Sequence, residues 1–376
     1  MEWQEKGEVK KEKIHNLFRC GYLDVRQWLE ETDVVLIPLG STEQHGRHLP
    51  VCTDSIATEL PCMLAAELAD VPYYQLIPFG YSPQHLHPAG IASGTVTLSA
   101  ATYQNVLYEV GRSLIHNGFN KLIFATGHTS NMKAVDPALR ALKYETDAFI
   151  CCYRNDAEAA PGLLKGTGLI ENPPEEAPGW HGSEVETAEC LYFERLYGKQ
   201  IVHLDRTDKD WTHAPKWITD VSDKFSKVNG SPYLTMNGLD VAWVPMDHQE
   251  YSDTGLIGRP GNPFTASAEK GKRIVQKKAE IMAEFINEVK KIKVHVKNRD
   301  YWNRTFARCS PEPLQEPGSL PGWVTAPPGR EARARLPPAA RPASTARSRR
   351  ASRTPADARP PTRCRARRAR GTPRTR

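Results

Sequence analysis

The sequence has no long hydrophobic run, no C-x-x-C pair and no N-terminal stretch typical of a secretory signal. No apolar segment approaches the roughly 20 residues that a helix needs to span a bilayer, so a membrane-spanning segment is not expected. The 8 cysteines are scattered along the chain, which argues against a disulfide scaffold and favours a reducing compartment. We therefore expect a soluble, cytoplasmic protein that does not contact membranes.

Lysine is absent from residues 310–376, and large aliphatic side chains are rare there. This segment has 16 arginines and 4 acidic residues, a net charge of +12, whereas the whole chain has +6 and residues 1–309 therefore have −6. A segment of this composition cannot bury enough apolar surface to offset the entropy of ordering, so we expect a disordered tail. It is either a basic arm for nucleic acid or an acidic partner, or, as the abrupt change of composition favours, a non-native extension.

Residues 1–309 are expected to form one folded domain in which apolar, β-rich runs alternate with helical patterns. The runs predict strands at residues 33–39, 74–79, 122–126 and 149–153. The helical patterns cover residues 55–68, 99–117 and 266–293. Long loops rich in Pro, Gly, Asp and Trp are expected at residues 155–180 and 205–262. The alternation indicates an α/β three-layer sandwich, in which helices flank both faces of a mainly parallel sheet.

The most informative segment follows the first predicted strand. Its loop holds Glu43, then His45 two residues later, and Asp54 nine residues beyond that. Carboxylates and imidazoles are ligands that Zn²⁺ or Mn²⁺ takes from proteins, and open α/β sheets place their sites at strand ends. Each residue alone has an ordinary explanation: a surface carboxylate, a loop histidine bonded to backbone, or a helix N-cap. Together they favour a metal-dependent hydrolase.

Two later segments add candidate ligands. His128 follows the strand at residues 122–126 and stands beside Gly127, which allows another part of the chain to approach closely. Glu186 lies three residues after Ser183, a spacing that also fits a capping box at the start of a helix. One carboxylate cannot fully serve as both cap and ligand, so both interpretations of Glu186 stay open.

Five motifs occur in the order in which one known family has them, and they span nearly all of residues 30–290. They are GSTEQHGRHLPVCTD at residues 40–54, the region 88–98 ending in GTVTL, ATGHTSN at 125–131, HGSEVET at 181–187, and DTGLIGRPGNPFTASAEKG at 253–271. On these motifs the chain resembles the creatininase (creatinine amidohydrolase) family. The tail at residues 310–376 lies outside the resemblance.

The resemblance implies a creatininase-like α/β sandwich with two divalent cations, Zn²⁺ or Mn²⁺, with Fe²⁺ as a further candidate. One cation would be bound by Glu43, Asp54 and His128. The other would be bound by His45, Asp54 and one more carboxylate, so that Asp54 bridges the pair. In creatininase that carboxylate lies two residues after the strand-end histidine, where this chain has Ser130. We assign its role to Glu186.

The resemblance also implies which residues act on the substrate. His181 resembles the family's proton-shuttling histidine and would deliver a proton to the leaving group. Glu184 is a second catalytic candidate, as base or as orienting residue. His85, Ser130 and Trp180 are candidates for substrate contact, and residues 246–250 are polar enough to reach a substrate.

A pair of cations can hold a water molecule, lower its pKa and polarise a carbonyl group. We therefore predict a hydrolase that acts on a small cyclic amide or a related carbonyl compound, in a homo-oligomer as is common in the family. One alternative is a hydrolase of an oxidised inositol ring, and another is a catalytically silent metal-binding assembly protein. Contact with nucleic acid is expected only through the tail.

Overall fold

The computed structural model describes residues 13–86, 94–156, 159–164, 166–169, 181–207, 225–226, 233–250, 252 and 263–301. The candidate substrate residue Trp180 and the whole tail at residues 310–376 lie outside the described residues. Every described residue belongs to one compact unit, Met1–Leu314. The predicted boundary between residues 309 and 310 stays a prediction.

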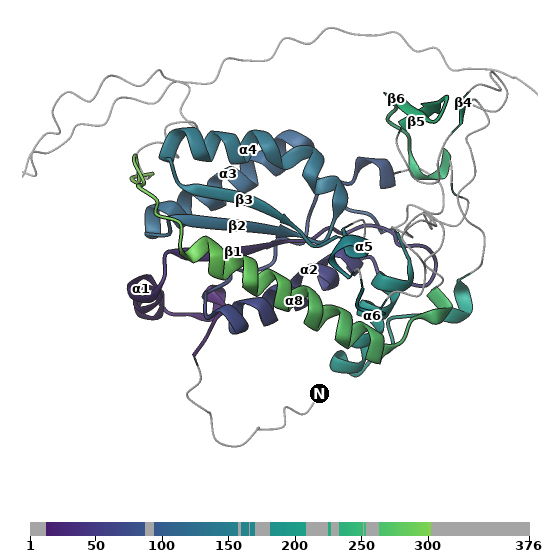
Figure 1. The fold of residues 1–376 in the computed structure, drawn as a ribbon, viewed down its shortest axis with the longest axis horizontal. Helices are drawn as coiled ribbons and strands as arrows, with labels where there is room; N and C mark the ends of the chain where they lie inside the picture. The colour runs from purple at the N-terminus through teal and green to yellow at the C-terminus, as the bar shows by residue number, and fades with distance from the viewer. Residues whose placement is uncertain are drawn as a thin grey trace, which may run out of the picture. The chain divides into compact units, whose positions relative to one another are not determined.

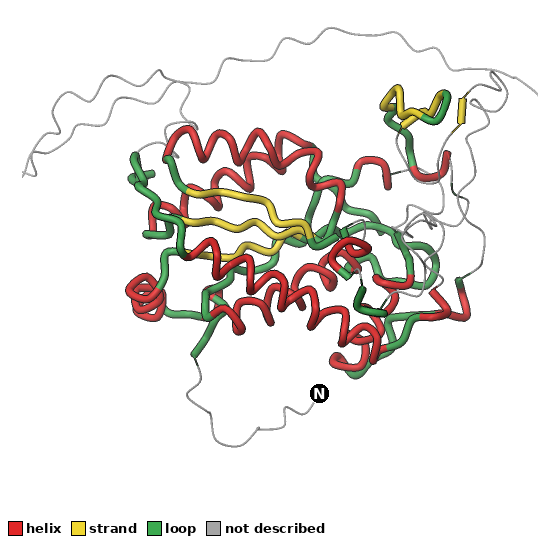
Figure 2. Tube along the Cα trace, viewed as in Figure 1, coloured by secondary structure: helices red, strands yellow, loops and turns green. Residues whose placement is uncertain are grey.

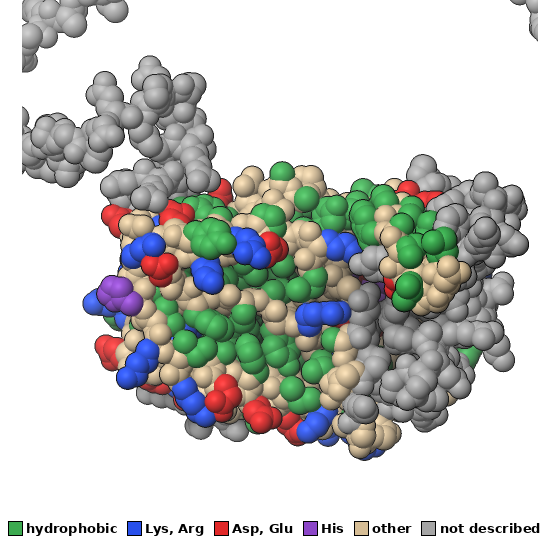
Figure 3. Space-filling view, turned by 45° about the horizontal axis from the view of Figure 1, so that its top comes forward, with side chains coloured by type: hydrophobic (Ala, Val, Ile, Leu, Met, Phe, Trp, Pro, Cys, Tyr) green, Lys and Arg blue, Asp and Glu red, His purple; other side chains and the backbone are tan. Residues whose placement is uncertain are grey.

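A parallel sheet of three strands, in the order β1-β2-β3, forms the centre of this unit. The strands are β1 (Val34–Leu39), β2 (Lys121–Thr126) and β3 (Phe149–Arg154). Every residue of β1 and β2 is buried, as expected of parallel strands that are covered on both faces. β3 lies at one edge of the described sheet and is only partly buried. Figure 3 shows a stretch of hydrophobic side chains across the middle of the face that it draws.

Helices cover both faces of this sheet (Figures 1 and 2). On one face lie α3 (Ala100–Asn117) and α4 (Met132–Thr146), which bury Val35, Ile37 and Phe124 of the sheet. On the other face lie α2 (Thr53–Ala69) and α8 (Ala268–Lys290), which bury Leu36 and Ile123. Successive residues of a strand point to opposite faces, so both sides of β1 and β2 must be apolar. The predicted three-layer α/β sandwich is confirmed.

The strand predicted at residues 74–79 is wrong. This segment runs beside β1 but makes only isolated bridges, between Leu36 and Tyr73 and between Leu39 and Ile77. The Tyr74 N–H donates to the Leu36 carbonyl and the Ile77 N–H to the Pro38 carbonyl, so three residues of the segment face two of β1 and the pairing is irregular. Pro38 also has no N–H to donate to the segment. The segment is extended, but it does not become a fourth strand of the sheet.

The described residues also form shorter elements. Their other α-helices are α1 (Tyr22–Glu31), α5 (Ala160–Leu163) and α6 (Glu184–Tyr197). Single 3₁₀ turns are η1 (Leu17–Arg19), η2 (Pro83–His85), η3 (Thr129–Asn131), η4 (Leu204–Arg206), η5 (His248–Glu250) and η6 (Pro263–Thr265). Among the described residues, no helix has the length and apolar character to cross a bilayer.

The segment expected to be a long loop, residues 205–262, contains a small antiparallel sheet. Its strands are β4 (Phe225–Ser226), β5 (Tyr233–Met236) and β6 (Leu239–Trp243). Asn237 and Gly238 join β5 to β6 with φ angles of +53° and +76°. An Asn-Gly pair favours a two-residue hairpin turn in which both residues have positive φ, so the local sequence accounts for this hairpin.

Candidate metal centre

The candidate ligands come from the carboxyl ends of two neighbouring strands. Glu43 and His45 lie in the loop after β1, Asp54 lies in the first turn of α2, and His128 lies two residues after β2. The two loops meet because the last residues of β1 and β2 are paired in register. Gly127 lets them approach, since a Cβ there would lie 2.5 Å from a side-chain oxygen and 3.0 Å from a backbone oxygen of α2.

Two groups of possible ligands share Asp54. In the first, His128 Nδ1 lies 3.2 Å from Asp54 Oδ2 and His128 Nε2 lies 3.4 Å from Glu43 Oε2. In the second, His45 Nε2 lies 3.5 Å from Asp54 Oδ1 and 3.8 Å from Glu186 Oε1. Within each group the ligand atoms all lie within 4.8 Å of one another, and all five side chains are buried. Each oxygen of Asp54 faces a different histidine, which is the arrangement that a bridging carboxylate requires.

The two carboxylate oxygens of Glu186 make different contacts, one typical of a helix cap and one typical of a metal ligand. Its Oε2 accepts a hydrogen bond from the Gly182 N–H at 2.7 Å, and its Oε1 is the atom that faces His45. Ser183, the N-cap residue of α6, makes no side-chain capping hydrogen bond, so the complete capping box is not formed. The backbone contact holds the carboxylate in place and leaves one oxygen directed at the candidate metal centre.

Backbone carbonyls orient both candidate histidine ligands. His45 Nδ1 lies 3.1 Å from the carbonyl oxygen of Glu43, and an N–H there leaves the lone pair on Nε2. His128 Nε2 lies 3.2 Å from the carbonyl oxygen of Tyr81 and 3.0 Å from Ser82 Oγ, which leaves Nδ1 to face Asp54. Such contacts fix the tautomer and ring orientation of metal-binding histidines.

Burial and mutual charge shift the pKa of every group in the two sets. Burial raises the pKa of Glu43 to about 7 and that of Glu186 to about 8, although neighbouring histidines oppose the shift. Burial alone would lower the pKa of His45 and His128, but the carboxylates raise these pKa values to about 10 and about 9. For Asp54, burial is outweighed by the two histidines, which lower its pKa.

These residues fit a pair of divalent cations. Among the described residues, the ion-pair partners of Glu43, Asp54 and Glu186 are histidines, so no lysine or arginine balances the three carboxylates. His45 Nε2 and Asp54 Oδ2 are buried and make no hydrogen bond within the part of the chain that the structure describes. Buried carboxylates require compensating positive charge, and a mixed carboxylate–imidazole set suits Zn²⁺ or Mn²⁺.

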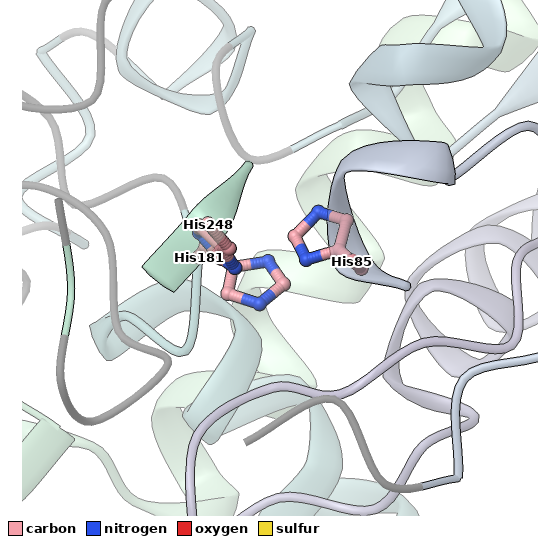
Figure 4. Close-up of side chains that lie close together, drawn as sticks. All are labelled: His85, His181 and His248. Carbon is pink, nitrogen blue, oxygen red and sulfur yellow. The ribbon is translucent and has the colours of Figure 1, made fainter. Parts of the chain in front are cut away.

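A second cluster, of three histidines, lies beside this centre. His85 of η2, His181 before α6 and His248 of η5 have ligand atoms within 4.8 Å of one another, and Figure 4 shows their rings close together. The amide nitrogen Nε2 of Gln44 lies 3.2 Å from His85 Nδ1, 3.2 Å from His181 Nε2 and 2.6 Å from His248 Nδ1. Burial, together with neighbouring histidines, lowers the pKa of all three rings well below the usual value, so they are neutral near pH 7.

His181 connects the two sets. Its ring stacks on His45 with centroids 4.0 Å apart, and its Nδ1 lies 3.6 Å from Glu43 Oε1. Glu43, His45 and His181 also form a group whose ligand atoms lie within 4.8 Å of one another. His181 is therefore placed to exchange a proton at the candidate metal centre, and it is also close enough to act as a ligand itself.

The other predicted residues lie at varying distances from the centre. His85 Nε2 lies 3.5 Å from Glu43 Oε1, so His85 borders the centre. Ser130 Oγ accepts a hydrogen bond from Gln84 Nε2 at 2.5 Å. Glu184 Oε1 lies 2.5 Å from Lys270 Nζ of α8, in an ion pair that joins α6 to α8. Ser130 and Glu184 belong to none of the four candidate ligand groups among the described residues, and their predicted roles stay predictions.

Sequence reasoning did not single out Gln44 or Ser82, and it considered His248 only as part of a polar segment. Gln44 contacts all three clustered histidines, and Ser82 Oγ lies 3.0 Å from His128 Nε2. The only local signal for Gln44 is its position between Glu43 and His45. Ser82 and His248 carry no comparable signal, because the loops that hold them meet the centre only in three dimensions.

Comparison with known proteins gives a consistent result. The family model described as creatinine amidohydrolase matches residues 20–286. A mycofactocin precursor peptide peptidase of Mycolicibacterium smegmatis is 32% identical over 157 residues, which cover 40% of this chain and 62% of that protein. A creatinine amidohydrolase of Pseudomonas putida is 27% identical over 68% of this chain and 89% of its own length. A 3-dehydro-scyllo-inosose hydrolase of Thermotoga maritima is 24% identical over 70% of this chain and 80% of its own length.

Solved structures agree with these relatives. A Bacteroides fragilis protein described as a creatinine amidohydrolase has a TM-score of 0.54 and 26% identity, covering 76% of this chain and 99% of its own. A creatininase structure in a manganese form has a TM-score of 0.54 and 24% identity, and covers 74% of this chain and 100% of its own. A mutant creatininase in a Zn–Zn form has the same TM-score and 23% identity, and the match covers 75% of this chain and 100% of that structure's chain. At these last two identities the likeness supports the fold alone.

Proposed function

Because the chain belongs to the creatininase (creatinine amidohydrolase) family, we propose that it is a divalent-metal-dependent amidohydrolase that cleaves a C–N bond of a small cyclic amide or a related carbonyl compound. One observation carries this proposal. Three buried carboxylates and two buried histidines lie together at the carboxyl ends of β1 and β2, and Asp54 belongs to both ligand groups. Relatives named as an amidohydrolase and a peptidase support hydrolysis of a C–N bond.

We assign one cation to Glu43, Asp54 and His128, and the other to His45, Asp54 and Glu186. When bound, two such cations would polarise a carbonyl oxygen and lower the pKa of a water molecule held near them. The mixed carboxylate–imidazole donors of both groups support Mn²⁺ or Zn²⁺ as the metals, and Fe²⁺ is a further candidate.

His181 moves the proton in this proposal. Burial and neighbouring histidines lower its pKa, so the ring is neutral near pH 7 and can accept a proton from the attacking water. The same nitrogen then gives that proton to the leaving nitrogen, which departs as a neutral amine. Stacking on His45 holds the ring against the candidate metal centre throughout.

The substrate class is proposed more broadly than creatinine itself. The family's creatininase has a carboxylate where this chain has Ser130, and here Ser130 Oγ is hydrogen-bonded to Gln84. His85, Ser130 and Trp180 remain the proposed substrate contacts. The similarity to a 3-dehydro-scyllo-inosose hydrolase keeps an oxidised inositol ring as the second candidate substrate.

The test is turnover by protein loaded separately with Zn²⁺ and with Mn²⁺ on creatinine, a formamide, a linear peptide and an oxidised inositol. We expect C–N cleavage of at least one amide and no turnover by Asp54→Asn, which keeps the shape of the side chain. Two bound metals without turnover of any compound would contradict the proposal and favour a silent metal-binding assembly protein.

Two further expectations concern the whole protein. We propose a homo-oligomer, which sedimentation of the purified full chain would test. We also propose a cytoplasmic location, which fractionation of cells expressing the native gene would test. A monomer in solution would contradict the first, and recovery in a secreted or membrane fraction would contradict the second.

A further inference from the structure

His85, His181 and His248 form a compact set of imidazoles, and the roles proposed above for His181 and His85 do not explain why three rings converge. They come from three segments far apart in the sequence, and all three are buried. His85 and His181 are stacked with centroids 4.8 Å apart, and His248 meets them edge-on at 4.2 and 4.7 Å (Figure 4). None of the three belongs to the two groups assigned to the cations.

The ring nitrogens of this histidine cluster converge on one point. Three of them lie between 2.6 and 3.2 Å from the amide nitrogen of Gln44. An amide NH₂ group has two protons, so it can donate to at most two of the three rings. Three imidazole nitrogens directed at one small region are typical of a cation site rather than of an amide-binding site.

The separations are also compatible with a tetrahedral ion. Ligands about 2.0–2.1 Å from a zinc ion lie roughly 3.3 Å apart when the geometry is tetrahedral. One nitrogen of each ring lies within 4.8 Å of one nitrogen of each of the other two rings, so small side-chain shifts would bring three nitrogens to that spacing. The Gly46 N–H donates a hydrogen bond to Gln44 Oε1 at 3.0 Å. When a cation binds, the Gln44 amide would rotate, either to leave room for the ion or to offer Oε1 as a fourth ligand.

We propose that His85, His181 and His248 form a third cation site, next to the two-metal centre and selective for Zn²⁺ over Mn²⁺. The selectivity follows from the donors, because a set of imidazoles without a carboxylate suits Zn²⁺, Co²⁺ or Cu²⁺ and is a poor site for Mn²⁺. The two assigned groups contain carboxylates and accept either metal. The third site therefore distinguishes the two metals where the main centre does not.

If the proposed function holds, a cation in this site inhibits the enzyme. A neutral imidazole has only one nitrogen lone pair, so a cation bound to His181 leaves none to accept the proton of the attacking water. Zn²⁺ in excess of two equivalents therefore inhibits the enzyme, and Mn²⁺ in the same excess does not. The binding itself does not depend on activity and is tested separately.

The experiment counts metal per chain by equilibrium dialysis of the full-length protein. We expect three equivalents of Zn²⁺ but two of Mn²⁺ for the wild type, and two equivalents of each for His248→Gln. The control His116→Gln changes an exposed histidine and keeps three equivalents of Zn²⁺. A Co²⁺ titration gives a second readout, since the visible absorption that the third equivalent adds is lost in His248→Gln.

The outcomes separate this inference from the proposed function. Two equivalents of Zn²⁺ in the wild type, or three retained in both His248→Gln and His85→Gln, would overturn the third site. Retention of two equivalents in the variants shows that they are folded and that the main centre is intact. A protein that binds three Zn²⁺ but hydrolyses none of the tested compounds would keep the third site and reject the hydrolase.

Discussion

Asp54 is the residue on which the candidate metal centre depends most. Its two oxygens face His128 at 3.2 Å and His45 at 3.5 Å, and its side chain belongs to both groups of possible ligands. The two histidines lower its pKa, so the carboxylate is ionised near pH 7. No other side chain in the two groups is shared in this way.

Replacement of Asp54 by alanine should release both cations and abolish turnover. The loss of metal affinity should exceed the roughly 10- to 100-fold effect typical of an outer-sphere change. Metal content after dialysis and kcat measure the two effects. The control Asp136→Ala removes an exposed carboxylate that pairs with Arg140, and it should change neither. Loss of only one cation from Asp54→Ala would show that the carboxylate does not bridge.

Replacement of His181 by alanine should leave two bound metals and lower kcat. Loss of a general acid–base group typically costs about 10²- to 10⁴-fold in rate. Metal content and kcat are measured on the same preparation. If the variant instead retains fewer than two metals, His181 is a ligand of the two-metal centre, as its group with Glu43 and His45 permits.

Metal binding should become tighter as the pH rises from 6 to 8. In the metal-free protein the pKa of Glu43 is raised to about 7 and that of Glu186 to about 8, and those of His128 and His45 to about 9 and about 10. At pH 6 these groups carry protons that a cation must displace, and fewer protons remain as the pH rises through 7 and 8. Titration calorimetry in two buffers of different ionisation enthalpy measures the protons released. A dissociation constant that does not change over this range would contradict the prediction.

At the scale of elements, the centre depends on the close approach of the β2 loop to α2. The Gly127 N–H donates to Thr58 Oγ1 at 2.8 Å, and Thr58 Oγ1 in turn lies 2.6 Å from the backbone oxygen of Asp54. A Cβ at position 127 would lie 2.5 Å from that hydroxyl and 3.0 Å from that backbone oxygen. One glycine therefore sets the spacing between the elements that carry His128 and Asp54.

Gly127→Ala should destabilise the protein and weaken metal binding. Overpacking at a buried contact costs about 1–3 kcal/mol, and a shift of α2 would also separate Asp54 from His128. Urea unfolding of the metal-free protein and dialysis against Zn²⁺ measure the two effects. Gly162→Ala is the matched control, because a Cβ there meets no atom within 4 Å. Equal stability of both variants would show that the approach at position 127 is not tight.

At the scale of the whole molecule, the folded domain and the arginine-rich tail differ in charge and composition. Residues 310–376 carry +12 and the rest of the chain carries −6. The folded unit buries its apolar side chains in the two layers beside the sheet, from residues between 17 and 289. The tail is therefore not expected to contribute to the stability of the centre.

Truncation after Cys309 should leave the melting temperature and the metal content unchanged, because the removed segment has few large aliphatic side chains to bury. Differential scanning calorimetry and metal analysis of both chains test this prediction. A lower melting temperature after truncation would show that the tail packs on the domain. A salt-dependent gel shift with nucleic acid that is lost on truncation would support the basic-arm interpretation of the tail.

The sequence by itself determined the three strands of the parallel sheet and four of the five candidate ligands of the metal centre. β1, β2 and β3 follow from continuous apolar runs, and parallel strands place the loops after β1 and β2 at one edge of the sheet. Glu43, His45, Asp54 and His128 are local to those loops or to the helix that follows. Their convergence could therefore be inferred before any coordinates were known. Glu186 required the family resemblance as well.

Only the tertiary structure decided what depends on contacts between distant segments. In the folded chain one oxygen of Glu186 accepts a hydrogen bond from the Gly182 N–H and the other faces His45, and Glu184 pairs with Lys270. The tertiary structure also brought His248 into contact with Gln44, 204 residues away in the chain. Hydrophobic periodicity predicts where helices and strands lie and which of their faces are buried. It does not predict which loops meet, because that depends on how the helix layers pack against the sheet.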